Sequence, residues 1–205
     1  MKIKSAVFER SVPDLKSCPK SLLPEFAFIG RSNVGKSSMI NLLSERSALA
    51  KVSVTPGKTQ LINFFLMNGS WHLVDLPGYG YAKVGQEQRA DFNRAVANYL
   101  EKRTNLALVF VLIDSRLEPQ RIDLEFIRWL AGCDVPFALV FTKTDKHGAA
   151  GVKANILHFE QTIAEWCDEA PPVFVTSSKT KSGRTELLSF IEKRLAMKPV
   201  VTPED

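Results

Sequence analysis

The stretch Gly30 to Ser37 reads G-R-S-N-V-G-K-S, and it lies between an apolar run at 26–29 and a second one at 39–43. Two glycines, a lysine and a serine at this spacing, after a strand and before a helix, are typical of a phosphate-binding loop. The glycines let successive backbone N–H groups point at phosphate oxygens. We expect Lys36 to reach the terminal phosphates and Ser37 to offer its hydroxyl to Mg²⁺. The nucleotide-binding residues expected here are Gly30, Arg31, Ser32, Asn33, Val34, Gly35, Lys36, Ser37 and Ser38.

The composition of the 205-residue chain is that of an ordinary globular domain, with 45% hydrophobic and 24% charged residues. We predict an N-terminal extension over 1–23, a nucleotide-binding domain over 24–197 and a frayed tail over 198–205. The sequence contains no apolar run of membrane-spanning length and no signal peptide, so we expect a cytoplasmic monomer with no membrane partner. The three cysteines and three histidines have no ligand spacing, and we predict no zinc site.

Alternating apolar runs predict a three-layer α/β fold with about six mostly parallel strands and helices on both faces. Asn68-Gly69 between two apolar runs is typical of a hairpin, so one strand should be antiparallel. Residues 6–8 indicate at most a short strand, and Ser182 is a candidate cap for the last helix. Ligands of such sheets bind at the carboxyl ends of the strands, where the motifs below fall.

A second motif, D-x-x-G, follows the hairpin at Asp75, Leu76, Pro77 and Gly78. A carboxylate at a strand end can hold Mg²⁺ through a water, and a glycine N–H can approach a γ-phosphate closely because no side chain intervenes. The motif is weak alone and becomes strong after a phosphate-binding loop.

Two further segments predict recognition of guanine. Asp145 ends the sequence Thr142, Lys143, Thr144, Asp145, and its carboxylate can accept from N1–H and the 2-amino group of guanine, whereas adenine would leave it unpaired. The Lys143 stem can lie along the base. Downstream, a backbone N–H of the small-residue segment Thr176, Ser177, Ser178 can donate to guanine O6.

The breaker-rich stretch 44–61 reads as a loop that supplies the remaining Mg²⁺ ligand. Thr55 and Thr59 are both candidates, and residue chemistry does not choose between them. We expect the γ-phosphate and Mg²⁺ to order this loop and the segment after Gly78.

Taken together, the motifs at 30–37, 55–60 (T-P-G-K-T-Q), 75–82 (D-L-P-G-Y-G-Y-A) and 142–145 (T-K-T-D) resemble those of the EngB family, also called YihA or YsxC. These are bacterial GTP-binding proteins of ribosome biogenesis, within the TrmE, Era, EngA, EngB and septin group. The resemblance runs from about Phe26 to Leu195.

The resemblance implies a GTPase that converts GTP to GDP and phosphate, a partner in the large ribosomal subunit or its precursor, and a need in cell division. It also implies Thr59 as the Mg²⁺ ligand, with Gly57, Lys58, Gln60 and Leu61 beside the nucleotide. Two departures stand out. Thr142 replaces the asparagine of many relatives, and Ser178 replaces the alanine of S-A-K. Both keep small or hydrogen-bonding groups, so guanine specificity is expected to survive.

The residue after Gly78 is Tyr79, where many GTPases place a glutamine that orients the attacking water. Intrinsic hydrolysis should therefore be slow. We hypothesise that K⁺ held by Asn33 supplies part of the missing positive charge. The expected catalytic residues are Lys36, Thr59, Gly78 and Asn33.

Two other functions fit parts of the sequence. A P-loop kinase acting on a small molecule would share the phosphate-binding loop but not the guanine motifs. A septin-like structural GTPase would share the motifs, but its coiled-coil or amphipathic extension is missing from the sequence.

Overall fold

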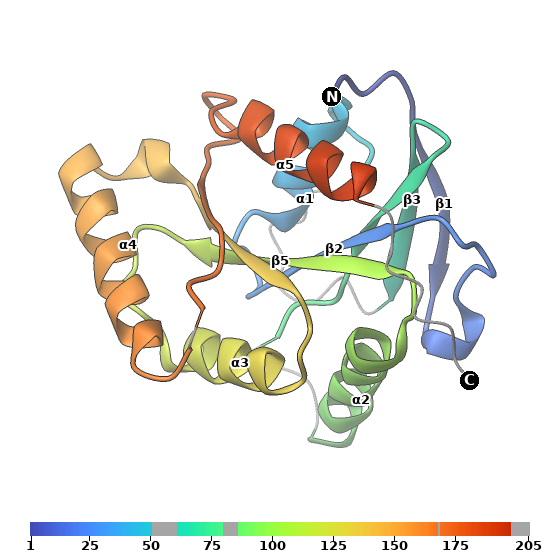
Figure 1. Cartoon of the computed structure of the whole chain (residues 1–205), viewed down its shortest axis with the longest axis horizontal. Coiled ribbons are helices and arrows are strands. Elements are labelled where there is room, and N and C mark those ends of the chain that lie inside the picture. Colours follow the sequence, from blue (N-terminus) through green and yellow to red (C-terminus); the bar gives the residue numbers. More distant parts are fainter. Residues whose placement is uncertain (51–60, 80–85, 168, 198–205) are drawn as a thin grey trace.

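Seven strands form one sheet in the computed structural model, which describes residues 1–50, 61–79, 86–167 and 169–197 (Figure 1). The strand order is β1-β3-β4-β2-β5-β6-β7. β3 pairs antiparallel with β1 and β4, and the other pairings are parallel, which confirms the predicted sheet with one antiparallel strand. The strands are β1 (Ala6–Val12), β2 (Glu25–Gly30), β3 (Ile62–Met67), β4 (Trp71–Asp75), β5 (Leu106–Asp114), β6 (Phe137–Thr142) and β7 (Val173–Val175).

The strand beyond the expected six is β1, for which the sequence indicated only residues 6–8. Within β1 only Ala6 and Val12 are buried, because the strand lies at the sheet edge and pairs on one side only. An edge strand with few buried side chains has a weak hydrophobic pattern, which explains why its length could not be predicted. Residues 6–12 thus share a sheet with the domain that follows; the domain boundaries remain predictions.

The β3–β4 hairpin turns at Asn68 and Gly69, which both have positive φ angles, 52° and 64°. Positive φ angles at two central residues are typical of tight hairpin turns, and the Ser70 N–H closes this turn on the Met67 carbonyl oxygen at 3.0 Å. Strand pairing begins at Met67 and Trp71, so three residues lie between the paired positions. The same register pairs Asn63 with Asp75 at the other end of the hairpin.

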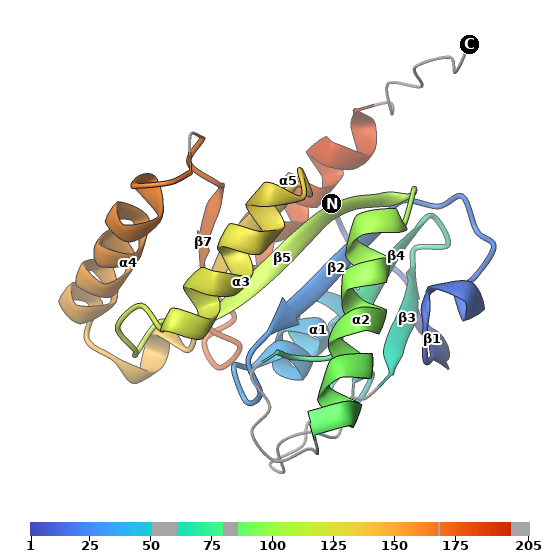
Figure 2. The same cartoon turned by 90° about the horizontal axis from the view of Figure 1, so that it is seen from below.

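Helices cover both faces of the sheet (Figures 1 and 2). On β2, Phe26 and Phe28 face a core shared with α1 and α5, while Ala27 and Ile29 face a core shared with α2, α3 and α4. Burial on both sides explains the continuous apolar runs of the central strands. The helices are α1 (Lys36–Ser44), α2 (Gln86–Lys102), α3 (Arg121–Gly132), α4 (Ala149–Ala164) and α5 (Arg184–Ala196), and none of those described is long and apolar enough to cross a bilayer.

The expected cap of the last helix was wrong. Gly183, not Ser182, precedes α5, with φ of 77° and no side-chain cap, and the Ser182 hydroxyl lies 3.1 Å from that of Thr180. A side chain at residue 183 would also collide with the carbonyl of Val175. Close packing of this turn against β7 therefore selects a glycine.

A buried polar cluster fixes the end of β2 that lies away from the glycine loop. The Glu25 carboxylate accepts from Tyr99 Oη at 2.6 Å, from Arg103 Nη2 at 2.6 Å and from Asn105 Nδ2 at 3.0 Å. Because Tyr99 lies in α2 and Arg103 follows it, the cluster anchors the carboxyl end of that helix to the sheet.

Candidate nucleotide-binding site

The loop 30–35 joins β2 to α1, and its backbone has a positive φ angle at two residues. Gly35 has φ of 109° and Asn33 has φ of 64°. A Cβ at Gly30 would lie 2.6 Å from the carbonyl oxygen of Leu112, so β5 leaves no room for a side chain there. α1 begins at Lys36 without a side-chain cap, and its free N–H groups suit an anion.

Lys36 and Asp75 meet at the centre of this site. The Lys36 ammonium donates to Asp75 Oδ1, and both side chains are buried. Asn63 Nδ2 donates to Asp75 Oδ2 at 3.5 Å. Sequence reasoning missed Asn63. A two-residue loop at Asn68-Gly69 would place residue 63 opposite residue 74, whereas the observed register pairs Asn63 with Asp75.

Gly78 lies directly against the phosphate-binding loop. A Cβ at this residue would lie 2.5 Å from the carbonyl oxygen of Gly30 and 3.5 Å from the backbone nitrogen of Ser32. The two backbone segments expected to border the terminal phosphate are therefore in contact. The side chains of Val34 and Leu76 are buried in the core, so these two residues can face a ligand only through their backbone.

Tyr79 points toward α3. Its hydroxyl donates to Asp123 Oδ1 at 2.8 Å, and its ring stacks on Phe126 with centroids 4.4 Å apart. Burial raises the pKa of the Tyr79 phenol and also that of the Asp123 carboxyl. The hydroxyl of Tyr79 is thus engaged by a helix and does not take the place of the missing glutamine.

The base segment is attached to the phosphate-binding loop. Thr142 Oγ1 donates to the carbonyl oxygen of Val34 at 2.6 Å, and Lys143 Nζ donates to that of Asn33 at 2.6 Å. Lys143 also donates to Asp114 Oδ2 at 2.9 Å and has φ of 61°. A threonine at position 142 therefore still ties the two motifs together through its hydroxyl.

Asp114, at the end of β5, is a second residue that sequence reasoning missed. Burial opposes its ionisation, but hydrogen bonds from Arg116 and Lys143 outweigh this and lower the pKa of Asp114 to about 2. Arg116 donates to both carboxylate oxygens, at 2.8 and 2.7 Å. An aspartate that ends an apolar strand was the available signal, because Asp75 was predicted from the same pattern.

Asp145 has one engaged and one open carboxylate oxygen. Oδ1 accepts from Ser177 Oγ at 2.6 Å, a bond that lowers the pKa of the carboxyl below its usual range. Oδ2 is buried and has no hydrogen-bond partner among the described residues. A buried acceptor of this kind is costly unless a ligand donor meets it, and guanine offers two adjacent donors.

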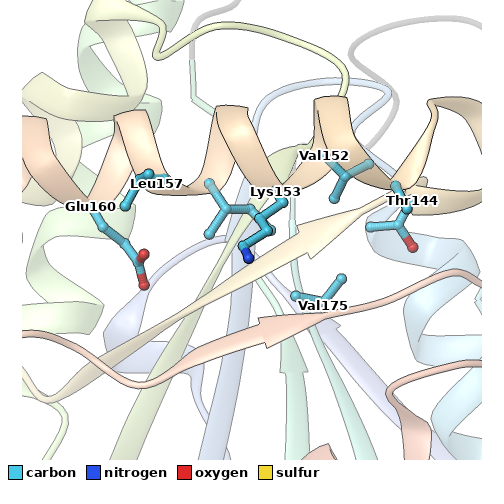
Figure 3. Close-up of a pocket in the computed structure, with 8 residues that line it drawn as sticks. Thr144, Val152, Lys153, Leu157, Glu160 and Val175 are labelled. Atoms are coloured by element: carbon cyan, nitrogen blue, oxygen red, sulfur yellow. The ribbon is translucent and has the colours of Figure 1, made fainter.

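Two other residues of the base segment, Thr176 and Thr144, are held by backbone carbonyls. Thr176 Oγ1 donates to the carbonyl oxygen of Phe141 at 2.9 Å, and Ser178 is exposed. Thr144 Oγ1 donates to the carbonyl oxygen of Thr176 at 3.1 Å, and Thr144 also borders an apolar groove of about 520 Å³ between α4 and β7 (Figure 3).

Several predicted residues lie outside the described part of the chain. These are Thr55, Gly57, Lys58, Thr59 and Gln60, while Leu61 is described and is exposed just before β3. Ser37 and Asp75 supply a hydroxyl and a carboxylate beside the loop, and oxygen donors are the ligands that Mg²⁺ prefers.

Comparison with known proteins identifies the family. The model for the 50S ribosome-binding GTPase family matches residues 25–143. The probable GTP-binding protein EngB of Bacteroides thetaiotaomicron is 52% identical over 192 residues, which cover 94% of this chain and 95% of that protein. The EngB protein of Porphyromonas gingivalis is also 52% identical, with 94% and 96% covered.

This chain belongs to the EngB family of GTPases. The predicted resemblance is therefore confirmed, and a small-molecule kinase is not supported.

Solved structures agree with this fold. A crystal structure of a probable GTP-binding protein EngB has a TM-score of 0.68 at 21% identity, covering 83% of this chain and 98% of that one. Era from Aquifex aeolicus, crystallised with GDP and AlF4⁻, has a TM-score of 0.69 at 21% identity, with 89% and 60% covered.

Proposed function

We propose that this protein is a guanine-nucleotide switch that hydrolyses GTP slowly with Mg²⁺ and acts in assembly of the large ribosomal subunit. The observation that carries the proposal is the Asp145 carboxylate, whose buried Oδ2 has no partner among the described residues while Ser177 holds Oδ1. Guanine presents N1–H and a 2-amino group side by side, so the two donors match the carboxylate. Adenine presents a lone pair at N1 and would leave the acceptor unpaired.

Other residues of this site would bind the phosphates and the metal. Lys36 reaches the terminal phosphates when it exchanges its contact with Asp75 for the nucleotide, and backbone N–H groups of 33–37 hold the other oxygens. Ser37 and Thr59 are the proposed direct ligands of Mg²⁺, and Asp75 holds it through a water. The bound metal would neutralise charge that develops on the phosphates.

Hydrolysis by this chain should be slow and dependent on potassium. Tyr79 stands where many GTPases place a glutamine, and its hydroxyl is held by α3, so the residue at this position does not orient the attacking water. Asn33, with its left-handed backbone, is the proposed ligand of K⁺ beside the phosphates. Equal hydrolysis rates in KCl and NaCl, with and without ribosomes, would rule out this role of potassium.

A ribosomal partner is supported by the description of the matching family model and by the formal charge of +5. We propose that the GTP form of a cytoplasmic monomer engages the large subunit or its precursor, and that normal cell division depends on it. Co-sedimentation with ribosomal subunits in GTP and in GDP, over a salt series, tests this partner. Phosphate contacts would make binding fall steeply with salt, whereas equal binding in both nucleotides would contradict a switch.

A nucleotide panel tests the core of the proposal. GTP, GDP, ATP and ADP should be competed against a fluorescent guanine nucleotide in Mg²⁺. Guanine nucleotides should bind at least about 100-fold more tightly than adenine nucleotides, because each unpaired charged hydrogen bond weakens binding about tenfold or more. Equal competition by ATP would disprove guanine recognition.

A further inference from the structure

A buried carboxylate in the first turn of α3 has no part in the expected nucleotide motifs. Asp123 is 1% exposed and lies 44 residues after Tyr79 in the chain. Burying an ionisable group costs free energy unless its contacts compensate. The contacts of Asp123 therefore indicate what the residue does.

One carboxylate oxygen holds the residue that follows the D-x-x-G motif. Asp123 Oδ1 accepts the Tyr79 hydroxyl at 2.8 Å, and Phe126, one turn further along α3, stacks on the Tyr79 ring at 4.4 Å with an interplanar angle of 21°. Ring and hydroxyl are both engaged, so the position of Tyr79 is fixed relative to α3. Because Gly78 is the preceding residue, the peptide that joins the two is fixed as well.

The other carboxylate oxygen faces the phosphate-binding loop. Asp123 Oδ2 lies 3.1 Å from Nε of Arg31, the second residue of that loop. The pair is close but poorly aligned for a hydrogen bond, so it acts mainly as an ion pair. Asp123 thus contacts both the loop before α1 and the segment after β4.

These two segments are the ones that touch each other at Gly78. A Cβ at that residue would lie 2.5 Å from the Gly30 carbonyl oxygen and 3.5 Å from the carbonyl carbon of Arg31. A shift of Tyr79 would change this contact directly. The terminal phosphate of GTP, which GDP lacks, is the ligand group that both segments would border.

We propose that Asp123 is a positioning residue for GTP hydrolysis, which holds Tyr79 and Arg31 so that the Gly78 peptide and the phosphate-binding loop border the terminal phosphate at a fixed separation. The inference rests on the proposed GTPase function and adds a residue outside its motifs. It assigns to Tyr79 an anchoring function in place of the water-orienting one of a glutamine. The effect of Asp123 should be confined to the γ-phosphate, because other residues hold the base and the two inner phosphates.

The test uses two tyrosines with the same chemistry. Tyr79→Phe removes the hydroxyl that donates to Asp123 and keeps the ring stacked on Phe126. Tyr99→Phe is the matched control, because Tyr99 is also buried and donates to a buried carboxylate, Glu25, at 2.6 Å. That bond lies at the opposite end of β2, beside the carboxyl end of α2.

Single-turnover hydrolysis at saturating GTP and the ratio of GTP to GDP affinity should be measured for both variants of the full chain. We expect Tyr79→Phe to lower the hydrolysis rate and the affinity ratio about tenfold, since a hydrogen bond to a carboxylate is lost, with GDP affinity unchanged. Tyr99→Phe should lower the unfolding temperature about as much as Tyr79→Phe does, because each loses one hydrogen bond to a buried carboxylate. It should leave both nucleotide readouts unchanged.

A second pair of variants separates positioning from folding. Asp123→Asn keeps an acceptor for the Tyr79 hydroxyl and loses only the ion pair with Arg31, so it should lose less hydrolysis than Asp123→Ala. Asp123→Ala loses both contacts and should lose at least as much as Tyr79→Phe. A hydrolysis rate and affinity ratio of Tyr79→Phe that match those of Tyr99→Phe would overturn the inference. If the unchanged protein fails to hydrolyse GTP or to prefer guanine, the proposed function itself fails, which is a different result.

Discussion

Replacement of Gly78 by alanine should weaken the binding of GTP and leave the binding of GDP nearly unchanged. A Cβ at this residue would lie 2.5 Å from the Gly30 carbonyl oxygen, whereas carbon atoms ordinarily pack about 3.5 Å from their neighbours. The segment after β4 must therefore move away from the phosphate-binding loop by about 1 Å. Gly78 does not have a positive φ angle, so this steric displacement is the effect of the substitution.

The expected loss follows from that displacement. A shift of about 1 Å is enough to break the hydrogen bond that the Gly78 N–H would donate to a γ-phosphate. A hydrogen bond to a charged group contributes about 1.5–3 kcal/mol, so GTP affinity should fall about 10- to 150-fold. GDP lacks the γ-phosphate, and its affinity should change by less than about threefold.

Calorimetric titration of Gly78→Ala with GDP and with a non-hydrolysable GTP analogue measures both affinities. Gly132→Ala is the control, because a Cβ at this last residue of α3 would meet nothing within 4 Å. An unchanged GTP analogue affinity in Gly78→Ala would refute the reasoning, and so would an equal loss of GDP affinity.

Three further outcomes are expected. Asp145→Asn should weaken GDP binding at least about tenfold and strengthen xanthosine diphosphate binding, because an amide donor would face the C2 carbonyl of xanthine; competition assays in which GDP still binds normally would contradict this. Glu25→Ala leaves the Arg103 guanidinium without its buried carboxylate and should lower the free energy of unfolding in urea by about 3 kcal/mol, and a loss below about 1 kcal/mol would show that the cluster contributes little. The pKa of Asp114 is lowered to about 2, so the folded protein binds this proton more weakly than the unfolded chain and its stabilisation, about 1 kcal/mol after solvent screening, is lost as pH falls from about 4 to 2. Asp114→Asn should remove that part of the acid dependence of the unfolding midpoint, and an unchanged dependence would show that the contacts of Asp114 with Arg116 and Lys143 contribute little to stability.

The sequence predicted the fold class because its signals are local. A glycine-rich loop between apolar runs, an Asn-Gly hairpin and buried strands that end in polar residues each depend on neighbouring residues. Parallel strands place their carboxyl ends at the same edge of a sheet. The sequence therefore predicts that residues 30–37, 75–78 and 142–145 lie close together at that edge. The edge strand β1 escaped this reasoning, because its burial is confined to two residues.

The contacts within the site could not be predicted in the same way. Lys36 pairs with Asp75, Lys143 with Asp114 and Tyr79 with Asp123, and these partners are 39, 29 and 44 residues apart. No sequence period relates such positions, because they meet only after strands and helices have packed. The contact of Asn63 with Asp75 escaped as well, because the observed hairpin register is one residue longer than a two-residue Asn-Gly loop gives.

The phosphate-binding loop from Gly30 to Ser37 is determined by sequence alone, since the glycines, lysine and serine act through their own backbone and side-chain chemistry. The tertiary structure decided what this loop touches. It brought Gly78 against the Gly30 carbonyl and Asp123 beside Arg31. It also placed the Thr142 hydroxyl within hydrogen-bond distance of the Val34 carbonyl oxygen. Local chemistry can be deduced from residue type, whereas these distances arise from the packing of β2 between β4 and β5 and of α3 against the sheet.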